Sequence, residues 1–124
     1  MHDQPSVLEL LQAVKSFIYE TAAPQLKGHA AYHALVASNA LSTAMRDLEQ
    51  RPNAATLERD GLTELLGPSN GLSLDALNRS LSEKIKSGEM TVQTPGLLAH
   101  LKQTTMAQVE IDQPRYSGLK TAKS

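Results

Sequence analysis

The sequence predicts an all-α fold, with about five helices in an up-and-down helical bundle and no sheet. Leucine and alanine dominate the composition, whereas strands prefer β-branched and aromatic residues. Aromatic residues are scarce: Phe17, Tyr19, Tyr32 and Tyr116 are the whole set. Apolar residues also recur three and four positions apart in several segments, and short connections separate these segments. Both patterns are typical of a helical bundle.

The chain length predicts a single helical domain, which we place at residues 1–112. A chain of 124 residues can bury roughly two thirds of the surface that its unfolded form exposes. Residues 113–124 contain basic residues and no acidic residue, so we expect a basic C-terminal tail that packs on the domain or on a partner chain. Arg115 and Tyr116, together with Leu119, are its predicted anchors.

Charge and composition exclude several functions. The formal net charge of −1 provides no basic field for nucleic acid. The absence of cysteine excludes disulfides, thiolate metal sites and cysteine nucleophiles. No apolar run approaches the ~20 residues of a membrane span, and the first residues do not form a signal peptide. We therefore expect a cytoplasmic bacterial protein that needs no cofactor.

The first helix is expected to begin after Asp3 as its N-cap, with Pro5 in the first turn, and to end near Thr21 because Pro24 follows. The next helix, around residues 29–48, is amphipathic. Its predicted buried face consists of His29, Tyr32, His33, Val36, Ala37, Ala40, Leu41, Ala44 and Leu48. Its predicted exposed face consists of Ser38, Ser42, Arg46 and Glu49.

Breaker residues divide the rest of the chain. Arg51-Pro52 is expected to end the central helix, and Asn53 to cap a shorter helix over residues 54–66 that Gly61 weakens. Ser73 is expected to cap a helix that closes at Gly88. The last helix is expected to start at Thr94-Pro95. The predicted inward residues are Leu57, Leu62, Leu65 and Leu66, then Leu74, Leu77, Leu81 and Ile85, then Leu97, Leu98, Leu101, Thr105 and Val109.

The candidate site is the polar cluster on the central helix: His29, Tyr32 and His33, with Asn39 at the edge. Three interpretations are open. His33 is a buried structural histidine bonded to a carbonyl, to tyrosine or to Asn39; or it exchanges protons in a pocket between helices; or the two histidines bind a metal ion. The metal interpretation is the weakest, because Ala30 replaces the glutamate of the zincin motif and no Glu-x-x-His occurs, so further ligands would have to come from His2, Asp3 or His100.

Residues 67–71 match the Gly-x-Ser-x-Gly pattern of serine hydrolases. A leucine-rich helix precedes this segment, whereas a nucleophile elbow requires a strand there. We interpret the segment as a turn.

Several short motifs together resemble a known family. They are Tyr32-His33-x-x-Val36-Ala37-x-Asn39-x-Leu41, the helix end Ile85–Glu89, the segment Asp112–Tyr116, and the opening residues His2–Leu11. The chain is similar to family six-two-eight-five of the bacterial domains of unknown function; Gln113 stands where that family has asparagine. The resemblance implies an all-α fold, and genes nearby for aminoglycoside-phosphotransferase-like kinases and acyl-CoA dehydrogenases. It implies no catalytic activity.

The sequence therefore predicts an accessory binding module rather than an enzyme. It would dock on a kinase-like or acyl-CoA dehydrogenase-like protein, or on a second copy of itself. The alternative is a small ligand-binding protein or enzyme that uses His33, Tyr32 and Asn39 in a pocket between helices.

Overall fold

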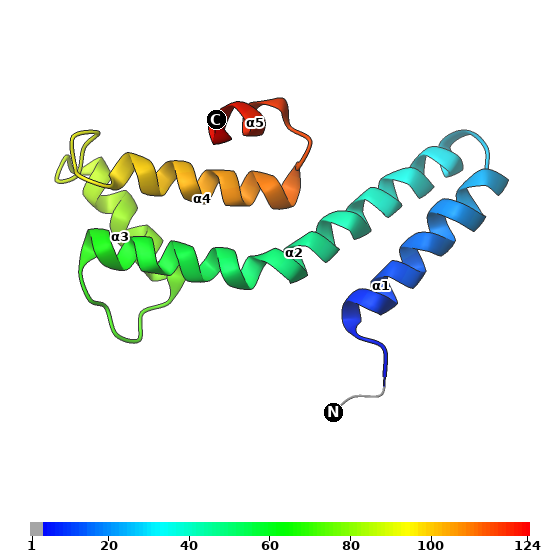
Figure 1. The fold of residues 1–124 in the computed structure, drawn as a ribbon, viewed down its shortest axis with the longest axis horizontal. Coiled ribbons are helices and arrows are strands. Elements are labelled where there is room, and N and C mark those ends of the chain that lie inside the picture. The colour runs from blue at the N-terminus through cyan, green and yellow to red at the C-terminus, as the bar shows by residue number, and fades with distance from the viewer. Residues whose placement is uncertain (1–3) are drawn as a thin grey trace. The chain divides into compact units, whose positions relative to one another are not determined.

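The computed structural model describes residues 4–124, and in this range it contains helices and no strand (Figure 1). This confirms the all-α prediction. The chain forms two compact units, Met1–Gln50 and Arg51–Ser124, which we describe separately.

The first unit begins with α1, Val7–Ser16, and its N-cap is Ser6. The backbone N–H of Glu9 donates to Ser6 Oγ over 3.1 Å, and the Ser6 N–H donates to Glu9 Oε1 over 3.4 Å. This reciprocal pair is a capping box. The predicted cap, Asp3, lies outside the described residues, and Pro5 precedes the cap instead of lying in the first turn. The chain continues as a π-helix, η1 (Phe17–Ala22), and a 3₁₀-helix, η2 (Ala23–Gln25), so that helical structure ends just after Pro24.

Helix α2 runs without interruption from Gly28 to Leu66. The predicted break at Arg51-Pro52 and the predicted cap at Asn53 are therefore wrong. Pro52 lies inside the helix, where it removes one backbone donor, and the remaining hydrogen bonds carry the helix past it. The Thr56 hydroxyl donates to the Pro52 carbonyl over 3.0 Å.

The first unit buries a different face of α2 from the one that we predicted. Ser38, predicted to be exposed, is only 2% exposed, whereas Val36 and Leu48 of the predicted buried face are 46% and 48% exposed. Around Ser38 lie half-buried residues on the same side of the helix: Ala31, Ala34, Leu41, Ser42 and Met45. In the first unit, α1 and the first half of α2 form a helical hairpin (Figure 1).

The second unit contains a leucine core. Leu62 of α2, Leu77 and Leu81 of α3 (Leu74–Lys86), and Leu97 of α4 (Leu97–Asp112) are 0–4% exposed and form one cluster. These four inward predictions are confirmed. Five others are wrong: Leu57, Ile85, Leu98 and Leu101 are 37–56% exposed, and Thr105 is exposed as well.

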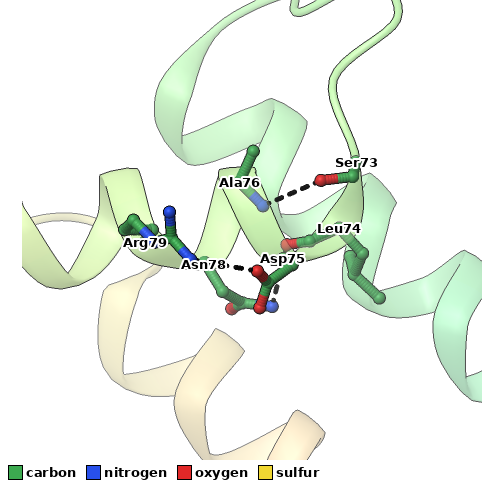
Figure 2. A network of polar contacts seen from close by, with 6 residues as sticks. All are labelled: Ser73, Leu74, Asp75, Ala76, Asn78 and Arg79. Atoms are coloured by element: carbon green, nitrogen blue, oxygen red, sulfur yellow. Dashed lines mark hydrogen bonds and ion pairs between the residues drawn. The ribbon is translucent and has the colours of Figure 1, made fainter.

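The first turn of α3 shows why this helix begins where the sequence predicts (Figure 2). Ser73 Oγ accepts a hydrogen bond from the Ala76 N–H over 3.1 Å, which confirms Ser73 as the N-cap. Asn78 Nδ2 donates to the Leu74 carbonyl over 3.2 Å, and Arg79 pairs with Asp75 over 3.2 Å.

The end of the chain forms one further helix. The tail contains α5, Ser117–Lys123, which lies against α4 and which we did not predict. Leu119 is 7% exposed, and Lys123 Nζ forms an ion pair with Glu110 of α4.

Candidate functional site

The predicted polar cluster lies on the surface of α2 in the first unit. His29, Tyr32, His33 and Asn39 are all exposed, and Tyr32 is 64% exposed. The ring centroid of His33 lies 6.3 Å from that of His29 and 5.8 Å from that of Tyr32. The three rings are thus neighbours, as the helical spacing predicts, but they form an exposed aromatic patch.

This exposure changes the interpretation of His33. It is not the buried structural histidine of the first interpretation. The two hollows described below are lined by residues of the second unit and contain none of the cluster. Over residues 4–124, no group of three or more His, Asp or Glu is placed to hold a metal ion, and the suggested ligands His2 and Asp3 lie outside that range.

The buried histidine of the second unit is His100. It is 7% exposed, and its ring lies directly against Gly61 of α2. A Cβ atom at position 61 would lie only 2.2 Å from His100 Nδ1. Gly61 was predicted to weaken its helix. Because it has no side chain, it leaves the space into which the imidazole of His100 packs.

Helices α2 and α4 border a hollow of about 300 Å³ in the second unit, which polar and apolar residues line together. Across it, Arg51 Nη1 donates to Gln108 Oε1 over 2.8 Å, and Gln108 Nε2 donates to Asp112 Oδ2 over 2.8 Å. Glu58, also in the lining, accepts from Asn78 Nδ2 of α3 over 2.9 Å. These hydrogen bonds connect α2 with α4 and with α3.

A second hollow, of about 360 Å³, lies beside α4 and is mainly apolar. Its lining includes Leu57, Met106 and Ala107, with Lys102 and Glu110 also present. Neither hollow is lined by a histidine that could act as the general base for a serine, threonine or lysine nucleophile.

Of the three predicted tail anchors, one is buried and two are exposed. Arg115 is exposed and Tyr116 is 56% exposed, whereas Leu119 is buried. The Tyr116 ring lies over Gly118, where an added Cβ would be 2.5 Å from Cε1.

The most prominent surface feature is apolar and belongs to the first unit. Within residues 4–50 the one buried side chain is Ser38, and no large apolar side chain is buried. Ten large apolar side chains in the same range are 40–64% exposed: Val7, Leu10, Val14, Phe17, Tyr19, Leu26, Tyr32, Leu35, Val36 and Leu48. We call these ten residues the hairpin surface. Where exposed apolar side chains form a contiguous patch, the patch marks an interaction site.

A comparison with known protein families identifies the family of this chain. Residues 24–116 match the model of a family described as Domain of unknown function (DUF6285). The chain belongs to the DUF6285 family. The matched segment contains all of α2, α3 and α4, and with them the polar cluster and the Arg115-Tyr116 pair; α1 and α5 lie outside it.

The family assignment confirms the resemblance found in the sequence motifs. No curated protein and no solved structure matches this DUF6285 chain. Within residues 4–124, no helix has the length and apolar character needed to cross a membrane.

Proposed function

We propose that this DUF6285 protein is an accessory module that binds another protein chain through the hairpin surface. The observation that carries the proposal is the inverted burial of the first unit: over residues 4–50 the large apolar side chains face solvent, and the one buried residue is a serine. Each of these side chains is 40–64% exposed, so it leaves unrealised about half of the roughly 1.5–3 kcal/mol that full burial contributes. A partner chain that covers the hairpin surface would recover part of that free energy.

The charge distribution supports the same proposal. Residues 28–45 of α2 contain no Asp, Glu, Lys or Arg, although much of this stretch is exposed. Solvated helix faces normally carry charges, whereas the central parts of protein interfaces are depleted of them.

The polar cluster has a place in this function. Tyrosine is enriched at interfaces because its ring provides apolar contact area and its hydroxyl a hydrogen bond. Tyr32 belongs to the hairpin surface, His33 lies beside Tyr32, and His29 lies beside His33. The cluster would supply hydrogen bonds to a docked chain.

The resemblance in the sequence suggests which partners to test: a kinase-like protein, an acyl-CoA dehydrogenase-like protein, or a second copy. The test is co-expression of the tagged chain with each candidate, followed by purification. We expect at least one candidate to be retained by the wild type and lost by Phe17→Glu, which introduces a charge at a side chain that is 60% exposed.

The matched control is Leu98→Glu. Leu98 is 56% exposed and lies on α4 in the second unit, so that this substitution adds the same charge outside the hairpin surface. The control should retain the partner. Retention of no candidate, or equal retention by both variants, would contradict the proposal.

A further inference from the structure

We infer that the chain covering α1 is α1 of a second copy, packed antiparallel, so that two hairpins form a four-helix bundle. This inference rests on the proposed function and names its partner. It starts from the four exposed apolar residues of α1 and its continuation, Val7, Leu10, Val14 and Phe17, which are 48–61% exposed. We call these four residues the α1 seam.

The spacing of the α1 seam is that of a helix–helix interface. The intervals of three, four and three residues are the a and d positions of a heptad, which lie along one stripe of the helix. In the hairpin the residues of α1 that are half-buried are others, among them Leu8, Leu11 and Lys15. The seam is therefore a second apolar face that the hairpin leaves uncovered.

Helical geometry places a stripe of α2 on the same side of the hairpin. Relative to buried Ser38, this stripe is offset by about a quarter turn and contains Ala37, Ala44 and Leu48. These residues belong to the face that the sequence predicts to be buried. Their small size allows another helix to approach closely, so a second copy would cover this stripe together with the α1 seam.

The size of this face is adequate for a dimer interface. Of the ten residues of the hairpin surface, helical geometry places the four residues of the α1 seam and Leu48 on this face, and each is about half exposed. At on the order of 100 Å² for each, these five side chains offer roughly 500 Å² of apolar surface per copy, which is the apolar part of a standard interface of about 800 Å² per partner.

A second copy fits this surface for two reasons. A two-helix hairpin is half of a four-helix bundle, and two copies related by a two-fold axis complete it. Residues 4–50 contain four acidic and three basic residues, so identical copies meet without a large like-charge repulsion. In an antiparallel pair centred near residue 12, Val7 faces Phe17 of the second copy, and Leu10 faces Val14.

The test is sedimentation equilibrium of the full chain. We expect the wild type to have twice the 13.4 kDa mass of one chain. Leu10→Lys and Val14→Glu should each raise the dimer dissociation constant at least tenfold, with helical circular dichroism retained. Leu98→Glu should leave the wild-type constant unchanged.

Mixing the two seam variants tests the pairing itself. In the antiparallel register, the lysine introduced by Leu10→Lys in one copy meets the glutamate introduced by Val14→Glu in the other. At the other such contact, Val14 of the first copy still meets Leu10 of the second copy. An equimolar mixture of the two variants should therefore form heterodimers. A parallel register places each introduced charge against an apolar side chain and restores nothing.

Two outcomes would overturn the inference: a monomeric wild type, or a mixture of the seam variants that stays monomeric. A monomer that still retains a co-expressed enzyme through Phe17 would leave the proposed function standing. Failure of the inference is therefore distinguishable from failure of the proposed function.

Discussion

Residues 4–50 and 51–124 are both built from helices, but the two units bury different kinds of side chain. The second unit buries six large apolar residues: Leu62, Leu77, Leu81, Leu97, Ile111 and Leu119. In the described part of the first unit, Ser38 is the one buried side chain. Because apolar burial is the dominant favourable contribution to folding, the second unit contains its own source of stability. On our proposal, the first unit depends on a chain that covers it.

The largest expected effect comes from removing part of the leucine core. Leu77→Ala should lower the free energy of unfolding of the second unit by about 2–5 kcal/mol, because Leu77 is 1% exposed and its loss leaves a cavity. Denaturant titration followed by circular dichroism measures this change. Val14→Ala in the first unit, where the side chain is 48% exposed, is the matched control. An equal loss of stability in both variants would remove the distinction between the units.

The contact between Gly61 and His100 predicts that Gly61→Ala changes stability in the direction opposite to that in an ordinary helix interior. In an ordinary helix interior, alanine in place of glycine stabilises by up to about 1 kcal/mol. Here the new Cβ would lie 2.2 Å from His100 Nδ1, so Gly61→Ala should destabilise by about 1–3 kcal/mol. In the His100→Ala background the same substitution should become neutral or stabilising. Thermal melts of wild type, Gly61→Ala, His100→Ala and the double variant form a double-mutant cycle. An equal effect of Gly61→Ala in both backgrounds would contradict the packing of His100 against Gly61.

The smallest expected effects on stability come from the N-cap serines, of which each unit has one. Ser73→Ala removes the cap of α3 and should lower the stability of the second unit by about 1 kcal/mol. Ser6→Ala removes the equivalent cap of α1. Its effect should appear in the dimer dissociation constant, and the main unfolding transition should stay within about 0.5 kcal/mol of wild type. A loss of core stability in Ser6→Ala would show that the two units unfold together.

The sequence predicted the fold class well because leucine periodicity and turn chemistry are local signals. Ser73 and the glycine at position 88 fixed the bounds of α3, and the glycine adopts the positive φ of 84° expected there. Pro52 was misread for a physical reason. Proline usually ends a helix, because it removes one backbone donor and its ring clashes with the carbonyl four residues before it, but α2 continues past Pro52.

The buried face of α4 could not be predicted from apolar periodicity. Leu98 and Leu101 are exposed, and the helix turns His100 and Ile111 inward together with the predicted Leu97. A histidine can occupy this face because Gly61, on another helix, leaves room for its ring. That complementarity joins residues far apart in the chain, and neither residue alone signals it.

The sequence predicted that the residues of the polar cluster are neighbours on one helix, but it did not predict their environment. The helical spacing predicted that His29, Tyr32 and His33 would be neighbours, and they are. The amphipathic pattern also marked an apolar face, but the pattern does not state what covers that face. The buried side of the first half of α2 is the side of Ser38, and most of the predicted apolar face stays exposed.

Hydrogen exchange of the full chain, measured at several protein concentrations, tests the central claim most directly. If α1 is stabilised by a second copy, its amides should be protected at high concentration and lose protection on dilution below the dissociation constant. The core amides of α3 and α4 should keep the same protection throughout. Protection of α1 that is equal to that of α3 and does not change with dilution would contradict the account.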